Sequence, residues 1–87
     1  MSKITRAEIE WKVKDLLINV ECVPEEKILP EAKLMEDFEM DSLDMVQLIM
    51  HIEKAFSLVV TDEKVYELHS CTYKQLCDFI ENEIHTL

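Results

Sequence analysis

The 87-residue chain has the length of one small domain, and its 19 acidic and 9 basic residues give a formal net charge of −10. A domain of this size holds one hydrophobic core without a second lobe to enclose a substrate cleft, which disfavours a self-contained enzyme. The negative charge disfavours nucleic acid and anionic membranes as partners. Hydrophobic residues make up 48% of the chain, which argues against a disordered protein.

The first predicted element is a helix from about Thr5 to Glu21. Thr5 followed by Glu8 fits a capping box, and apolar residues then recur at helical spacing. Trp11 and Ile18 fall on the opposite side of this helix. They are either a second, partly covered contact or scattered surface hydrophobics.

A long loop is predicted from Cys22 to Met40, where the periodicity is lost and Pro24 and Pro30 interrupt the chain. Its apolar residues are expected to anchor it to the core: Val23, Ile28, Leu34, Met35 and Phe38. Long connections of this kind tend to be functional.

The second predicted helix runs from about Asp41 to Ala55 or Phe56 and carries two apolar stripes. The narrower stripe, Leu43, Val46 and Met50, begins beside Ser42. The broad stripe consists of Met45, Leu48, Ile49, Ile52 and Phe56.

Two further helices complete the predicted fold. The run SLVV, residues 57–60, has β-propensity but no strand to pair with, so it is predicted as a loop. A short third helix follows from Thr61 to Leu68, and Thr72 with Gln75 opens a fourth. The apolar stripe of the fourth helix is Tyr73, Leu76, Cys77, Ile80, Ile84 and Leu87. The predicted fold is all-α, a four-helix bundle with a short third helix and a long loop between helices one and two.

Several site chemistries fail on spacing. A calcium loop starting at Asp37 would need glycine and glutamate where the chain has Ser42 and Leu48. The three histidines match no helical zinc pair, and a chain without glycine has no glycine-rich phosphate loop. A nucleophilic Ser42 would need a nearby base, but His51 lies nine residues along the same helix, roughly 13 Å away by helical rise. We therefore predict no metal site and no catalytic residues.

The cysteines and the apolar runs indicate a cellular location. Cys22, Cys71 and Cys77 form no CxxC pair, which favours reduced thiols over a disulfide framework. The uninterrupted apolar runs are too short to cross a bilayer. We expect a cytoplasmic, monomeric protein with one domain over residues 1–87 and no membrane insertion.

The environment of Ser42 suggests a site for attachment of a phosphate group. With Asp41 as the N-cap and Asp44 three residues on, Ser42 is the first helical residue and is expected to face solvent. A phosphodiester there would lie at the positive end of the helix dipole. Taken alone, Asp-Ser before an apolar run is also a common helix start.

The surrounding sequence extends this pattern. The segment LMEDFEMDSLDMVQLIMHIEKAF, residues 34–56, resembles the acyl carrier protein signature, with an acidic-hydrophobic lead-in, Asp-Ser-Leu, and a helix of the form DxVxLxMxxExxF. VPEEKI upstream, and VVTDEKVYEL and TYKQLCDFIENEI downstream, are similar to the family's other elements. The resemblance covers nearly the whole chain.

The resemblance implies that Ser42 receives 4'-phosphopantetheine from coenzyme A through a phosphopantetheinyl transferase. The arm's thiol then holds acyl groups as thioesters for separate acyl-processing enzymes with basic docking patches. Asp41, Leu43 and Asp44 match residues that flank the arm. The implied partner-facing residues are Asp44, Val46, Met50 and Glu53. The resemblance also suggests four residues that line an acyl pocket: Met45, Ile49, Leu68 and Tyr73. The alternative is that these four are only part of the hydrophobic core.

Three departures from the family pattern bear on the function. Glu39 stands where glycine is usual, so either a non-glycine residue takes an unusual backbone angle or the loop runs differently. On the second helix Gln47 and Lys54 stand where acidic residues are common and His51 where a small residue is common, so the recognition face is less acidic. The segment LHSCTYKQL is about two residues longer than the usual connection between the third and fourth helices. Fatty-acid synthesis is the expected pathway. The alternatives are a carrier dedicated to polyketide or aminoacyl loading and, more remotely, an unmodified helical interaction protein.

Overall fold

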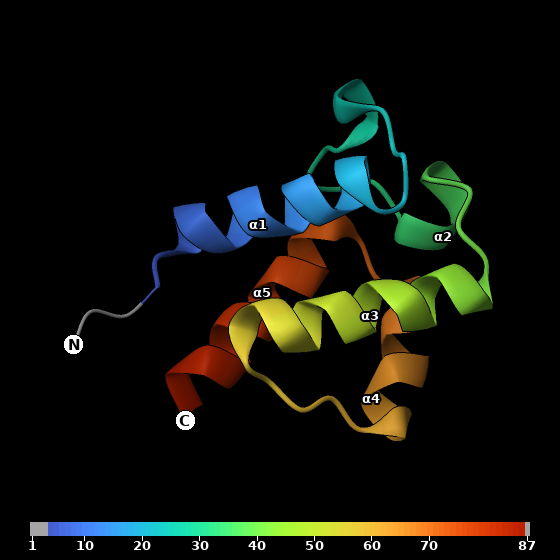
Figure 1. Ribbon diagram of the computed structural model, residues 1–87. Helices are drawn as coiled ribbons and strands as arrows, with labels where there is room; N and C mark the ends of the chain where they lie inside the picture. The colour runs from blue at the N-terminus through green and yellow to red at the C-terminus, as the bar shows by residue number, and fades with distance from the viewer. Residues whose placement is uncertain (1–3, 87) are drawn as a thin grey trace.

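The computed structural model describes residues 4–86, and the elements in this range are helices joined by loops (Figure 1). In chain order they are α1 (Arg6–Asn19), the 3₁₀ turn η1 (Glu25–Lys27), α2 (Leu34–Asp37), α3 (Ser42–Phe56), α4 (Asp62–Glu67), the 3₁₀ turn η2 (Leu68–Ser70) and α5 (Tyr73–Thr86). α1 packs against both α3 and α5, and α3 contacts α4. Because α1 and α3 run in opposite directions, the end of α1 lies near the start of α3 (Figure 1).

The all-α fold and its four principal helices are confirmed, but the long loop between the first two is not structureless. It contains η1 and α2. In α2 the backbone N–H of Asp37 donates to the carbonyl of Lys33 at 2.8 Å, and the Asp37 carboxylate accepts the N–H of Lys33 at 2.6 Å. A four-residue helix is too short to show a repeating apolar pattern, which is why periodicity missed it.

Side-chain caps begin the helices where the sequence predicted them. Thr5 and Glu8 form the predicted capping box of α1, which ends at Asn19, two residues earlier than predicted. At the start of α5 the N–H of Thr72 donates to Oε1 of Gln75 at 2.9 Å, and the N–H of Gln75 donates to Oγ1 of Thr72 at 3.1 Å. Each pair satisfies backbone donors that the helix itself leaves open.

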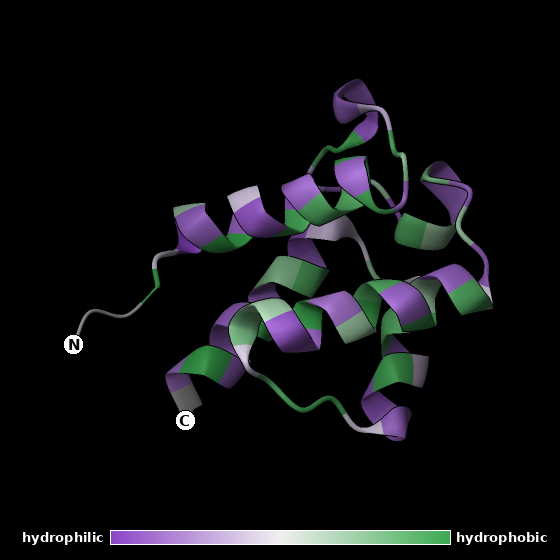
Figure 2. Ribbon diagram, viewed as in Figure 1, coloured by the Kyte–Doolittle hydropathy of each residue, from purple (hydrophilic) through white to green (hydrophobic). Residues whose placement is uncertain are grey.

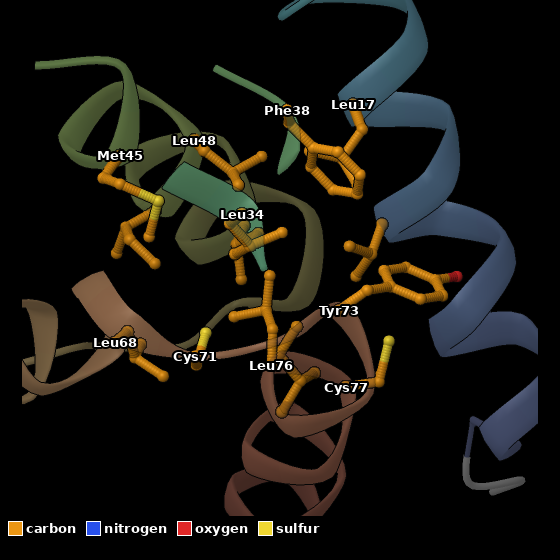
Figure 3. Close-up of a cluster of buried hydrophobic side chains, with 14 of the residues drawn as sticks. Leu17, Leu34, Phe38, Met45, Leu48, Leu68, Cys71, Tyr73, Leu76 and Cys77 are labelled. Carbon is orange, nitrogen blue, oxygen red and sulfur yellow. The ribbon is translucent and has the colours of Figure 1, made fainter. Parts of the chain in front are cut away.

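One core fills the space between α1, α3 and α5 and extends under the loops (Figure 3). Hydrophobic and hydrophilic residues alternate along the ribbons of α1 and α3 (Figure 2). The predicted inner stripe of α3 is buried along its whole length. In the 57–60 run, confirmed as a loop, Leu58 and Val60 are buried whereas Val59 is 84% exposed. Trp11 is 65% exposed, as expected of a surface hydrophobic. Leu87, the last residue of the stripe predicted for the fourth helix, lies outside the described residues.

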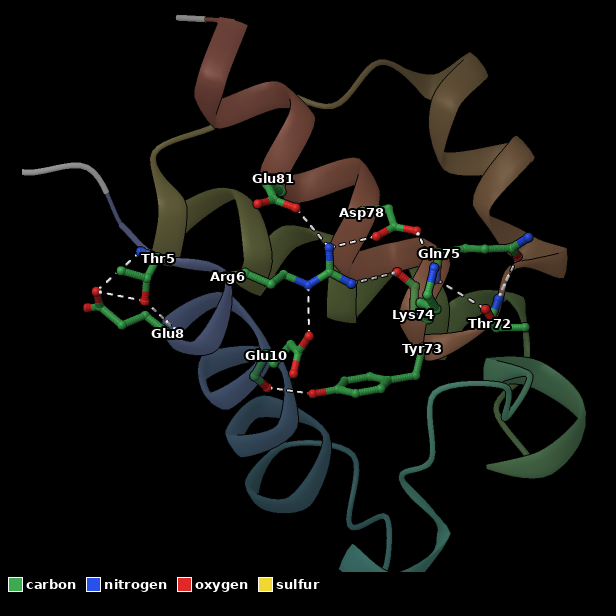
Figure 4. Close-up of polar contacts among 10 residues, drawn as sticks. All are labelled: Thr5, Arg6, Glu8, Glu10, Thr72, Tyr73, Lys74, Gln75, Asp78 and Glu81. Atoms are coloured by element: carbon green, nitrogen blue, oxygen red, sulfur yellow. Dashed lines mark hydrogen bonds and ion pairs between the residues drawn. The ribbon is translucent and has the colours of Figure 1, made fainter.

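Arg6 joins the two ends of the chain (Figure 4). Its guanidinium donates to Glu10 at 2.8 Å, to Asp78 at 2.6 Å and to Glu81 at 2.8 Å. The hydrogen bond from Arg6 holds the pKa of Asp78 below its usual value. The hydroxyl of Tyr73 donates to the backbone carbonyl of Glu10 at 2.6 Å. These contacts fix α1 against α5.

Candidate functional site

Ser42 is the first residue of α3, and its neighbours supply the cap. The N–H of Asp44 donates to Oδ1 of Asp41 at 2.8 Å, and the N–H of Asp41 donates to Oδ2 of Asp44 at 3.1 Å. This is the arrangement that the sequence predicted. Because the two aspartates cap the helix, the hydroxyl of Ser42 is not needed for capping.

The Ser42 hydroxyl is available for chemistry. Ser42 is exposed, and its Oγ makes no hydrogen bond to the described residues, nor do the backbone N–H groups of Ser42 and Leu43. Those donors and the dipole of a 15-residue helix favour a phosphate esterified to this oxygen. The residues present therefore fit a phosphodiester on Ser42, provided that the phosphate lies away from the two capping carboxylates.

Glu39 turns the chain into this site by adopting the left-handed conformation, with φ of 56°. Of the two alternatives left open by the missing glycine, the first therefore holds. The N–H of Met40 then donates to the carbonyl of Met35 at 3.1 Å, and Met40 is buried. Cys22 and Ser57 also have positive φ, 59° and 56°. Residues 4–86 therefore contain three left-handed turns, and none is made by a glycine, which the sequence lacks.

The narrower stripe of α3 faces solvent beside Ser42. Leu43 is 66% exposed, Val46 40% and Met50 51%, and they form one apolar strip along the helix. The carboxylate of Glu53 instead accepts the backbone N–H of Val60 at 2.8 Å and so supports the loop that follows α3. Asp44 is half-buried and is part of the cap.

All four residues suggested for an acyl pocket are buried, but Tyr73 lies apart from Met45 and Leu68. Figure 3 shows Met45 and Leu68 on one side of Leu34, whereas Tyr73 points toward α1 on the other. The hydroxyl of Tyr73 is bonded to the carbonyl of Glu10, the residue whose carboxylate pairs with Arg6. The structure thus separates it from Met45 and Leu68.

A cysteine that the sequence analysis did not connect with the pocket lies next to Leu68. The N–H of Cys71 donates to the carbonyl of Leu68 at 3.2 Å, and Cys71 is buried. Burial raises the pKa of the Cys71 thiol to about 11 and that of Cys77 to about 12. Both thiols are therefore protonated near neutral pH.

Glu21 is a second residue that sequence reasoning missed. It follows α1, and its Oε2 is buried without a hydrogen-bond partner among the described residues. Burial, and then repulsion from Asp44 and Asp41, raises the pKa of Glu21, whereas the charge of His51 on α3 acts in the opposite direction. A glutamate next to helical hydrophobics gave no signal in sequence, because its burial depends on how the end of α1 packs on α3.

Residues 4–86 offer neither a metal site nor a membrane-spanning helix. Histidine, cysteine, aspartate and glutamate side chains do not gather there in any group of three that would hold a metal ion. The helices of this part of the chain are also too short or too polar to cross a membrane.

Comparison with known proteins gives a consistent result. Residues 11–80 match the family model described as a phosphopantetheine attachment site. The chain is 38% identical over 81 residues to an acyl carrier protein of Thermosynechococcus vestitus, covering 93% of this chain and 98% of that protein. It is also 38% identical over 77 residues to an acyl carrier protein of Chlorobium phaeovibrioides, covering 88% of this chain and 96% of the relative.

The fold has a counterpart among solved structures. The acyl carrier protein from Enterococcus faecalis superposes with a TM-score of 0.75 at 19% identity, covering 92% of this chain and 99% of that one. At this identity the match supports the architecture alone.

Proposed function

This chain belongs to the acyl carrier protein family, and we propose that it carries acyl groups as thioesters on a 4'-phosphopantetheine arm attached to Ser42. One observation supports this assignment above the others. Ser42 has an exposed hydroxyl without a hydrogen-bond partner among the described residues, at the capped start of α3, inside the segment matched by the attachment-site model.

The residues around Ser42 have separate parts in arm attachment. A phosphopantetheinyl transferase would form the bond between Ser42 Oγ and the phosphorus of coenzyme A's phosphopantetheine. The bond to the nucleotide's phosphate breaks, the serine proton is lost, and adenosine bisphosphate leaves. Asp41 keeps the hydroxyl out of the capping bonds, and Leu43 offers an apolar surface beside it. When bound, the arm supplies the thiol that holds the acyl group.

The exposed strip Leu43, Val46 and Met50 is proposed to contact the partner enzymes, with Asp44 beside it. An apolar strip on a strongly acidic protein suits enzymes whose docking patches are basic around an apolar centre. Glu53 joins this surface only through the part of its carboxylate that Val60 does not use.

Met45, Ile49 and Leu68 are the residues that we propose to line an acyl pocket. All three are buried, and a chain lying between them would be sheltered from water. Tyr73 was suggested with them from the sequence, and it would enter such a pocket only by giving up its bond to Glu10.

We further propose that residues 1–87 form a single carrier domain that acts as a cytoplasmic monomer with no catalysis of its own. Fatty-acid synthesis is the expected pathway because it is the typical role of the family. A carrier dedicated to another acyl pathway is the second candidate, since exposed Gln47, His51 and Lys54 make this face of α3 less acidic.

Loading of the arm tests the proposal. The protein is incubated with coenzyme A and a phosphopantetheinyl transferase, and its intact mass is measured. We expect the mass of one phosphopantetheine to be added to the wild-type chain and not to Ser42→Ala. No mass change with several transferases would overturn the carrier function.

The partner strip has its own test, Met50→Glu. Because Met50 is 51% exposed, the variant should melt as cooperatively as the wild type while transferring acyl groups to partner enzymes more slowly. Trp11→Glu is the matched control, since Trp11 is an exposed hydrophobic on α1. Equal transfer rates for the two variants would remove Met50 from the docking surface.

A further inference from the structure

A hollow of about 600 Å³ lies between η1, the turn after it and α2. Leu29 lines this hollow and is 59% exposed. Ala32, also in the lining, is buried. An exposed leucine in a concavity of this size presents a site for an apolar group.

The hollow is held in shape by backbone bonds to the start of α5. The carbonyl of Pro30 accepts the N–H of Lys74 at 2.9 Å, and the carbonyl of Ala32 accepts the N–H of Tyr73 at 2.9 Å. Leu34 N–H donates to the carbonyl of Cys71 at 3.2 Å. The segment is therefore fixed before any partner arrives, which lowers the entropic cost of binding.

Carboxylates surround the exposed leucine. Glu26 and Glu31 line the hollow, and their side chains make no hydrogen bond or ion pair within residues 4–86. Glu36, in the same lining, has one partner, the ammonium of Lys33 at 3.3 Å. Lys27 also lines the hollow and is positively charged, but its ammonium pairs with Glu39 at 3.7 Å. The rim thus has negative charge that the chain itself does not neutralise.

Resting on the proposed carrier function, we propose that this hollow is a second docking surface. Its occupant is a segment of an acyl-processing enzyme that presents an apolar side chain flanked by lysine or arginine. The apolar side chain would rest on Leu29 while the cations meet Glu26 and Glu31. A second copy of this chain is a poor occupant, because two molecules of formal charge −10 repel each other.

A second contact would have a specific consequence for the arm. The hollow lies on the segment that leads into Ser42, so an enzyme that holds both surfaces would fix the direction in which the arm leaves the serine.

Short synthetic peptides test the surface directly by NMR titration of the full, isotope-labelled chain. One peptide has leucine flanked by lysines, a second replaces leucine by serine, and a third replaces the lysines by glutamine. We expect the first to shift the amides of residues 26–37 and the other two to bind about tenfold more weakly, because each lacks one half of the recognition.

The double variant Leu29→Ser/Glu31→Lys should weaken binding of the first peptide by about tenfold. The matched control is Val59→Ser/Glu83→Lys, whose residues line a different surface hollow, and it should bind like the wild type. Amide shifts outside 26–37 alone, equal binding of the three peptides, or equal loss in both variants would each overturn the proposal.

Loading of Ser42 is measured on the same preparations by intact mass. A chain that loads but does not bind the peptide at the hollow keeps its carrier function and loses the second surface. A chain that binds the peptide there but never loads contradicts the carrier function and, with it, the assignment of an acyl-processing enzyme as the occupant.

Discussion

Replacing Glu39 by glycine is expected to make the protein more stable than replacing it by alanine. Glu39 has φ of 56°, and a residue with a Cβ in this region costs about 1 to 2 kcal/mol. Glycine avoids that cost but loses about 0.5 to 1 kcal/mol more conformational entropy on folding than alanine. Taking the middle of each range, the glycine variant should be about 0.75 kcal/mol more stable than the alanine variant.

Comparing the two variants removes the side-chain contribution. Both lose the exposed ion pair between Glu39 and Lys27, whose 3.7 Å separation makes it worth less than about 1 kcal/mol. The remaining difference reports the backbone. For a domain of this size it corresponds to a melting temperature about 3 to 6 °C higher for the glycine variant.

Thermal and urea unfolding of both variants give the measurement. Glu36 in α2 supplies a control of opposite sign, because a helical position should favour alanine over glycine by about 1 kcal/mol. If Glu39→Gly unfolds at or below the temperature of Glu39→Ala, Glu39 does not hold the left-handed conformation in solution, and this account of the approach to Ser42 is wrong.

Two further predictions concern charge. Glu21→Leu should raise the free energy of unfolding by about 1 kcal/mol near pH 7, because it removes a buried oxygen without a partner. The pKa of Glu21 is raised in the folded protein, so the contribution of Glu21 to stability is present below the ordinary glutamate pKa and is lost as pH rises through the pKa of the folded state. Glu21→Gln should therefore raise the free energy of unfolding more near pH 7 than near about pH 4. An equal increase at both pH values would contradict this. The pKa of Asp78 is lowered by Arg6. The contribution of Asp78 to stability is therefore present above the ordinary aspartate pKa and is lost as pH falls through the pKa of the folded state. Arg6→Gln should lower stability near pH 7 and reduce the loss on acidification, and an acid unfolding curve unchanged in slope would refute the assignment.

The parts of the fold that could be predicted are those encoded by local sequence features, namely apolar periodicity and capping residues. α3 has 15 residues, two apolar stripes and a cap made by Asp41 and Asp44, so its start, its inner face and the exposure of Ser42 all follow from local pattern. The same holds for Thr72 and Gln75 at the start of α5. In contrast, α2 has four residues, fewer than two helical turns, and no periodicity could reveal it.

The rest depends on contacts between distant segments. The stripe of α5 predicted that Tyr73 is buried, but not that its hydroxyl reaches Glu10 on α1 and turns the ring away from Met45. The Oε2 atom of Glu21 becomes buried only when the end of α1 packs on α3. The angle at Glu39 was left open, because a missing glycine shows that a turn must be made differently but not how.

The most direct test of the central claim is the state of Ser42 in the protein recovered from its own cells. After digestion, the peptide containing Ser42 is fragmented in a mass spectrometer. We predict that this peptide is heavier by one phosphopantetheine, localised to Ser42, and that acyl thioesters are found on its thiol. An unmodified Ser42, or a phosphopantetheine on another residue, would contradict the account.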